Sequence, residues 1–150
     1  MEIDYKTILE IQQNRPPYLM IDYATNVIPG ELSEGYKNLD DEWFFKVHWK
    51  NDPNMPGMLQ IEALVQMASL SILSIKGNEG KIMYLTSADK LKFFRKIIKG
   101  DRLEIKTKII TWKRGMGLFE GAGYVNNQIA CKARFNLILP DEIKMFKINT

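Results

Sequence analysis

Apolar and polar residues recur with different periods along the chain, and these periods predict one long helix among about six strands. Residues 3–13 and 57–76 have apolar residues at helical spacing. Segments rich in β-branched and aromatic residues, or with alternating apolar residues, predict the strands. We expect the strands at residues 18–28, 31–38, 81–88, 102–113, 115–125 and 128–139.

The helix predicted at residues 57–76 is apolar on nearly every side, which indicates that it is buried on most sides. The last two strands are joined by Asn126 and Asn127, and asparagine tolerates the positive φ of a tight hairpin. We therefore expect an α+β fold, a curved antiparallel sheet wrapped around one long central helix. Residues 40–57 read as an irregular aromatic loop that must pack against something, such as a partner subunit, and Pro140 starts a charged tail.

Composition limits the classes of protein that fit this pattern. A chain of 150 residues, 45% hydrophobic and 26% charged, is typical of a single globular domain spanning residues 1–150. The lone Cys131 excludes an internal disulfide and favours a reducing cytoplasm, and residues 1–15 lack the apolar core of a secretory signal. The apolar stretch at residues 58–75 contains Glu62, which argues against a membrane span. A net charge of +3 does not call for nucleic acid.

Two side chains are candidates for acid–base chemistry. His48 is the only histidine, and histidine is the side chain that most readily exchanges a proton near neutral pH, although a lone histidine is more often structural. Glu62 lies in the second turn of a helix that looks buried, and burial would raise its pKa so that it could donate a proton. Gln66 lies one turn further on, where it can orient this carboxyl group. The alternative is that Glu62, Gln66 and Ser69 form a narrow wet stripe on the helix.

Met55, Pro56 and Gly57 stand at the start of the same helix. The first N–H groups of a helix have no partner within it, and glycine lets a ligand approach the backbone closely. This site could therefore polarise a thioester carbonyl, as an oxyanion hole does. Without its neighbours, the segment would be read as a plain junction between a loop and a helix.

Three ordered blocks resemble the FabZ-type 3-hydroxyacyl-[acyl carrier protein] dehydratases. The run from His48 to Gln66, HWKNDPNMPGMLQIEALVQ, keeps the family's spacing from histidine to MPG to acid to glutamine. Residues 15–22, RPPYLMID, and residues 92–103, KFFRKIIKGDRL, are similar to two further family segments. The related FabA enzymes carry aspartate where this chain has Glu62. The resemblance covers residues 15–139 and implies the hot-dog fold.

The chain also departs from the family pattern. Val47 replaces a glycine before the histidine, residues 49–51 replace Phe-Pro-Gly after it, and Lys99 replaces a proline. These changes leave the chemistry possible but put the usual substrate in doubt.

The resemblance implies dehydration of a 3-hydroxyacyl thioester in fatty acid or related acyl biosynthesis, with His48 as base, Glu62 as acid and the Gly57 N–H on the thioester carbonyl. We expect Pro56, Gln66, Phe93 and Phe94 to line the substrate path. The resemblance also implies a homodimer, with a trimer of dimers as a further level, in which His48 and Glu62 of one site come from different subunits. No metal or nucleotide cofactor is indicated by the sequence.

A basic stretch overlaps the third of these blocks and consists of Lys90, Lys92, Arg95, Lys96, Lys99 and Arg102. Arg95, Lys96 and Lys99 could bind an acidic acyl carrier protein, or could form a solvated positive face. The thioester donor could also be coenzyme A. Two other functions remain open at this point: a hot-dog thioesterase, which would not need His48, and a non-catalytic module that binds acyl thioesters.

Overall fold

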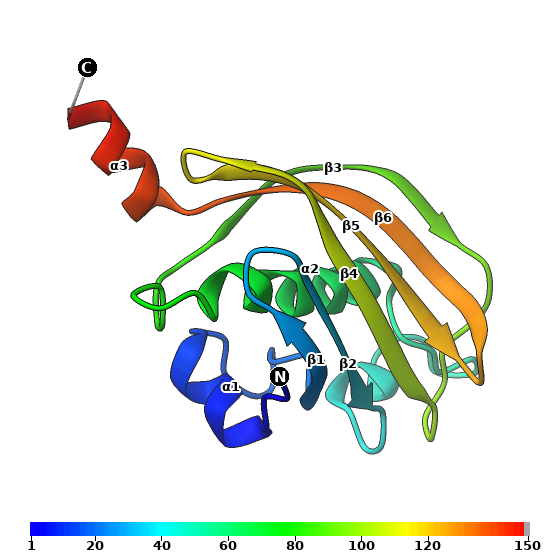
Figure 1. Ribbon diagram of the computed structural model, residues 1–150. Helices are drawn as coiled ribbons and strands as arrows, with labels where there is room; N and C mark the ends of the chain where they lie inside the picture. Colours follow the sequence, from blue (N-terminus) through cyan, green and yellow to red (C-terminus); the bar gives the residue numbers. More distant parts are fainter. Residues whose placement is uncertain (149–150) are drawn as a thin grey trace.

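The structure is a six-stranded antiparallel sheet curved around one long helix, α2 (Figure 1). The computed structural model describes residues 1–148. The strand order is β1-β2-β4-β5-β6-β3. The elements are, in chain order, α1 (Tyr5–Ile11), β1 (Tyr23–Ile28), β2 (Leu32–Asn38), the 3-10 helix η1 (Trp43–Lys46), α2 (Gly57–Leu73), β3 (Tyr84–Phe93), β4 (Arg102–Lys113), β5 (Met116–Val125), β6 (Gln128–Ile138) and α3 (Pro140–Ile148). The predicted fold class is thus confirmed.

Helix α2 is buried because the sheet covers it on most sides. All its residues from Gln60 to Leu73 are buried except Glu62. Glycines on β5 let the helix approach the sheet closely: a Cβ on Gly121 would lie 3.3 Å from the Leu64 Cβ, and one on Gly123 would lie 3.7 Å from a Leu64 methyl carbon. Close packing of this kind fixes the depth at which the helix presents its side chains.

The hairpins follow the turn chemistry that the sequence predicts. Asn126 and Asn127 join β5 to β6 with φ of 51° and 64°, the left-handed conformation of a two-residue hairpin. Arg114 and Gly115 join β4 to β5 in the same region of φ, at 55° and 80°.

Strand β3 is an open edge of the sheet. Among residues 1–148 it pairs with β6 alone, and nine of its ten residues are exposed. Tyr84 is 55% exposed, Leu85 43% and Phe93 47%. Exposed edge strands with large apolar side chains are uncommon in isolated chains because they pair readily with other strands.

Several predicted boundaries shift in the structure. The strand predicted at residues 18–28 starts at Tyr23, because the backbone before it is held by side-chain hydrogen bonds: Met20 N–H donates to Gln66 Oε1. The strand predicted at residues 81–88 spans Tyr84–Phe93 instead, and α2 ends at Leu73 rather than near residue 76.

The aromatic loop divides its side chains between the core and the surface. Phe44 and Phe45 are buried in this chain's own core, so they need no partner to shield them. Trp43 and Trp49 remain 40% and 59% exposed.

The charged tail expected after Pro140 is wrong as a description of local structure, because residues 140–148 form helix α3. Proline fits the first turn of a helix, and Asp141 and Glu142 favour the positive end of the helix dipole. In Figure 1, α3 extends away from the end of the sheet.

Candidate active site

The carboxyl group of Glu62 is held by the side chain of Gln66. Gln66 Nε2 donates to Glu62 Oε1 at 2.9 Å and to the Tyr18 carbonyl at 3.0 Å. Its Oε1 accepts from the Met20 N–H at 2.7 Å. Because all three bonds require one orientation of the amide, Gln66 fixes the carboxyl group relative to both α2 and residues 18–20.

Burial alters the proton affinity of Glu62. Loss of water around the carboxyl group raises its pKa above the ordinary value, and the hydrogen bond from Gln66 opposes this effect only in part. Glu62 is therefore a carboxyl group that holds its proton to higher pH than an exposed glutamate, as a general acid must.

His48 follows η1 and is oriented by the loop that it starts. Its Nδ1 lies 3.1 Å from the Asn54 carbonyl oxygen, and the Asn54 N–H donates to the His48 carbonyl at 2.8 Å. Since a carbonyl only accepts, Nδ1 carries the proton in a neutral ring, and Nε2 is then free to act as a base.

Gly57 begins α2 beside Phe93. Gly57 and Met58 lie in the first turn, where a helix offers no carbonyl to their N–H groups. A Cβ added to Gly57 would come within 3.0 Å of two carbon atoms of the Phe93 ring. The structure thus places Phe93 against the glycine predicted to bind the thioester carbonyl, with Pro56 at the helix cap.

A pocket of about 150 Å³ adjoins Glu62 and Gln66 and continues along α2 past Val65, Ser69 and Leu73. His48 is not among the residues that line this pocket. One chain therefore brings together Glu62 with Gln66, and Gly57 with Phe93, but leaves His48 outside the Glu62 pocket.

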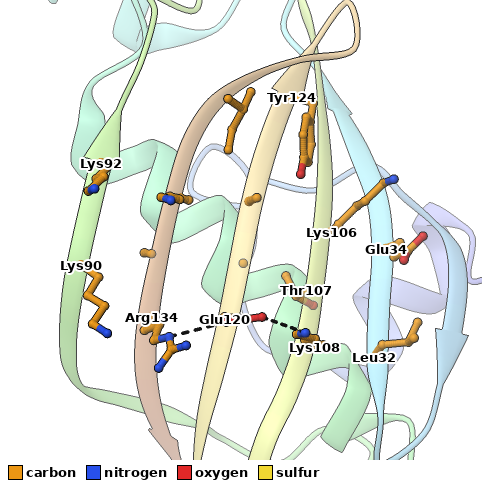
Figure 2. Close-up of a pocket in the computed structure, with 15 residues that line it drawn as sticks. Leu32, Glu34, Lys90, Lys92, Lys106, Thr107, Lys108, Glu120, Tyr124 and Arg134 are labelled. Atoms are coloured by element: carbon orange, nitrogen blue, oxygen red, sulfur yellow. Dashed lines mark ion pairs between the residues drawn. The ribbon is translucent and has the colours of Figure 1, made fainter.

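A larger hollow lies on the face of the sheet that points away from α2. It has a volume of about 790 Å³ and opens over β2, β4, β5, β6 and β3, with α2 behind the sheet (Figure 2). Lys108 and Arg134 converge there on Glu120, at 2.9 and 3.5 Å. None of the residues that the sequence singles out for catalysis lines this hollow.

The basic residues considered for docking already have partners in the chain. Lys96 Nζ lies 2.8 Å from Asp52 Oδ1, and Lys99 Nζ lies 3.7 Å from Asp41 Oδ1. Arg95 donates to Gln128 Oε1 at 2.6 Å. Phe94, predicted to line the substrate path, is 50% exposed and faces the ammonium group of Lys132 at 5.8 Å.

Sequence reasoning missed three contributors to the site. Tyr18 lies near Glu62. The pKa of its phenol is raised mainly by burial and to a smaller extent by the neighbouring charge of Glu62. The Met20 N–H and the Asn54 carbonyl act through the backbone. No residue type marks such backbone groups in a sequence, so only the fold could identify them.

Two further findings concern metal binding and membrane crossing. Among residues 1–148, no cluster of three or more His, Cys, Asp or Glu side chains is arranged to bind a metal ion. Within the same range, no helix combines the length and the apolar character that crossing a membrane requires.

A curved sheet around a buried helix, with an acid held at the second turn of that helix, defines a hot-dog protein with a candidate acid–base site. The family model for a FabA-like domain matches residues 13–134, and the chain belongs to this family. The predicted resemblance is confirmed.

Similar proteins include 3-hydroxyacyl-[acyl-carrier-protein] dehydratases FabZ from two bacteria. The protein from Alkaliphilus metalliredigens is 37% identical over 147 residues, which covers 96% of this chain and all of the relative. The protein from Clostridium novyi is 36% identical over 138 residues, which covers 90% of this chain and 97% of the relative.

Solved structures share the fold at low sequence identity. The dehydratase heterocomplex ApeI:P from Xenorhabdus doucetiae contains a chain with a TM-score of 0.75 and 14% identity, covering 95% of this chain and 97% of that one. A hypothetical thioesterase with coenzyme A from Streptococcus pneumoniae has a TM-score of 0.61 and 13% identity, covering 77% of this chain and 83% of that one.

Proposed function

We propose that this protein dehydrates (3R)-3-hydroxyacyl-[acyl carrier protein] to the trans-2-enoyl thioester in fatty acid biosynthesis. The observation that carries the proposal is the partly buried Glu62 carboxyl group, whose pKa is raised by loss of water around it and whose orientation is fixed by Gln66. The FabZ relatives, which match over nearly the whole chain, support the same reaction.

Three groups of the protein carry out the steps of the reaction. The substrate carbonyl accepts a hydrogen bond from the Gly57 N–H, which stabilises the negative charge that develops on that oxygen. Neutral His48 removes the C2 proton through Nε2. Protonated Glu62 gives its proton to the C3 hydroxyl group, the C3–O bond breaks, and water leaves as the C2–C3 double bond forms. The proton on His48 then returns Glu62 to its acid form through solvent, so no cofactor is consumed.

We further propose that the active unit is a homodimer joined through β3. The edge of β3 is unpaired and carries exposed apolar side chains, and pairing with a second copy would cover them. His48 lies outside the Glu62 pocket of its own chain, so the two groups of one site would come from different subunits.

The acyl carrier protein is proposed as the thioester donor, with docking at Arg95, Lys96 and Lys99. Lys96 and Lys99 are more than 60% exposed despite their ion pairs, so they can also interact with an acidic partner. Charge reversal at Arg95 and Lys96 should raise KM for a carrier-bound substrate and leave KM for a pantetheine substrate unchanged. An equal rise for both substrates would show that these residues have another role.

The reducing cytoplasm is the proposed compartment. The only thiol, Cys131, is buried and unpaired, and a free thiol is stable under reducing conditions.

The direct test is a spectroscopic assay with 3-hydroxyacyl and crotonyl thioesters. The wild type should interconvert the hydroxyacyl and enoyl forms, and His48→Ala and Glu62→Gln should each lower kcat by about 10²-fold or more. Release of free thiol, with no enoyl product, would instead indicate a thioesterase. Binding of the thioesters without turnover would indicate a non-catalytic module.

A further inference from the structure

Lys37 is a buried lysine that contacts two carboxylates from separate parts of the chain. It lies on β2 and is only 8% exposed. Its Nζ lies 3.2 Å from Oδ1 of Asp22, which precedes β1, and 3.1 Å from Oε1 of Glu42, the residue that caps η1. Burial alone lowers the pKa of a lysine, but the two carboxylates outweigh this effect and raise the pKa of Lys37 above its ordinary value. Lys37 is therefore charged, and it joins Asp22 to Glu42.

A buried ion pair of this kind fixes geometry more than it adds stability. Charged groups lose water when they are buried, and well-packed apolar side chains in the same place often give a protein that is equally stable or more stable. The main effect of Lys37 is thus to hold two carboxylates in one arrangement. Its role in the protein depends on the segments to which those carboxylates belong.

The Asp22 end has other attachments to β2. The Asp22 N–H donates to the Tyr36 carbonyl at 2.9 Å, and Asp22 Oδ2 accepts from the Asn38 N–H at 2.7 Å. Neither bond involves the side chain of Lys37. The segment before Asp22, which orients Gln66, therefore keeps its place by contacts that are independent of Lys37.

The Glu42 end depends more strongly on Lys37. Within residues 1–148, Lys37 is the only side chain bound to the Glu42 carboxylate. Glu42 starts η1, and the Phe44 carbonyl in that helix accepts from the His48 N–H at 2.9 Å. Burial of the Phe44 ring fixes the depth of η1 in the core, and an exposed bond from Trp43 Nε1 at 3.2 Å adds a surface attachment. The ion pair with Lys37 is the buried attachment at the first end of η1, so it fixes the direction of this short helix.

We propose that Lys37 is a positioning residue for His48: through Glu42 it holds η1, and η1 aims the imidazole at the substrate. This inference rests on the proposed dehydration and adds a residue that touches neither the substrate nor the reacting groups. In the proposed homodimer, His48 of one chain works with Glu62 of the partner subunit. Lys37 therefore serves the site that its own His48 completes, and not the site that contains its own Glu62.

The first experiment detaches η1 with Glu42→Ala, which leaves the pair between Lys37 and Asp22 intact. We expect kcat for a 3-hydroxyacyl pantetheine to fall about tenfold with KM nearly unchanged, because a small misplacement of a catalytic group lowers the rate without weakening binding. Asp41→Ala is the matched control. The Asp41 side chain is 73% exposed and its ion pairs lie at the surface, so this variant should keep the wild-type kcat. Equal kcat values for the two variants would overturn the inference.

A double variant links the effect of Glu42 to Lys37. Lys37→Met alone would leave two carboxylates without their cation, at a large cost in stability, so it is combined with Glu42→Ala. Both changes break the same contact, and the double variant should therefore have the kcat of Glu42→Ala. A further tenfold fall would show that the two residues act separately, which contradicts the proposed role.

Mixed dimers separate positioning from a general loss of folding. Co-expression of a Glu62→Gln chain with a His48→Ala chain gives one intact site, whose imidazole comes from the Glu62→Gln chain. Activity should be about tenfold lower with Glu42→Ala on that chain than with Glu42→Ala on the other. The same activity for both placements would mean that Glu42 does not act through the His48 of its own chain.

The magnetic resonance signal of His48 keeps the test independent of the reaction. His48 is the only histidine, so isotope-labelled histidine reports on one imidazole. The contact of Nδ1 with the Asn54 carbonyl favours the form protonated at Nδ1. Glu42→Ala should shift these resonances toward those of free histidine, and Asp41→Ala should not. Absence of turnover in the wild type would contradict the dehydration, while this shift would still support the positioning role and unchanged resonances would refute it.

Discussion

Glu62 combines two properties that oppose each other in a folded protein. It is a carboxyl group in a helix that is otherwise buried, and it must remain neutral to stay there at low cost. The Gln66 amide donates a hydrogen bond to a Glu62 carboxyl oxygen, which favours the charged form and lowers the pKa of Glu62. Loss of water around the carboxyl group raises this pKa, and that effect is the larger of the two. Glu62 therefore keeps its proton to higher pH than an exposed glutamate, and the free energy of unfolding falls once the carboxyl group ionises.

This balance predicts that Glu62→Gln stabilises the protein at high pH. Glu62 has a raised pKa in the folded chain and its ordinary value of 4.5 once unfolded. As pH rises from 4.5 through the folded pKa, the unfolded chain loses its proton first, so folding is progressively weakened. Glutamine cannot ionise, so the variant should gain in free energy of unfolding over the wild type at about pH 8 and not at about pH 5. Urea unfolding at both pH values measures this. The same difference at both would show that ionisation is not the cause.

Gln66→Met should destabilise the protein by about 2 kcal/mol. Methionine has a similar length but leaves the Met20 N–H without its acceptor, and an unsatisfied buried donor costs about 1–3 kcal/mol. Ser69→Ala is a matched control on the same face of α2. The Ser69 hydroxyl bonds only to the Gln66 carbonyl of its own helix, so its loss should cost less than about 1 kcal/mol. Equal losses in urea unfolding would argue against a bridging role for the Gln66 side chain.

At the scale of elements, the contact between β1 and β2 depends on one small residue. A Cβ on Gly35 would lie 2.0 Å from the Tyr23 carbonyl oxygen and 2.6 Å from the Met67 methyl carbon. Pairing shifts register between Ala24 and Asn26, next to this contact. Gly35 thus lets both the backbone of the paired strand β1 and the Met67 side chain of α2 come close to β2 at this point.

We expect Gly35→Ala to lower the free energy of unfolding by about 3 kcal/mol or more, because backbone atoms must move to admit the methyl group. Ser33→Ala on the same strand is the control. The Ser33 hydroxyl is buried without a hydrogen-bond partner, so removing it should change stability by less than about 1 kcal/mol. Thermal and urea unfolding of both variants test the pair, and a tolerated Gly35→Ala would show that β1 can shift freely.

At the scale of the whole molecule, the proposed site needs two chains. Co-expression of His48→Ala with Glu62→Gln tests this directly, because a mixed dimer would contain one site with both native groups. Random pairing should restore about a quarter of wild-type activity, since half the dimers are mixed and each has one intact site. If both groups of a site came from one chain, every site would keep a defect and the mixture would stay inactive.

The sequence was sufficient for the parts of the structure that rest on local pattern. The long apolar helix, the Asn126–Asn127 hairpin and the Glu62–Gln66 pair follow from periodicity, turn chemistry and one-turn spacing. The contacts that complete the site are not local: residues 18–20 reach Gln66 across more than 40 positions, and Phe93 of strand β3 contacts Gly57 at the start of α2. Helix α3 was missed because charged residues near a chain end suggest a tail as readily as a helix.

The bare edge of β3 has a consequence for how the protein behaves at low concentration. A newly made or diluted chain presents a ten-residue strand with its backbone groups unsatisfied on one side. Until a second copy of the chain pairs with β3, this edge can form hydrogen bonds with extended segments of other chains. Specific activity should therefore fall on dilution before the fold is lost, and aggregation should compete with assembly during refolding.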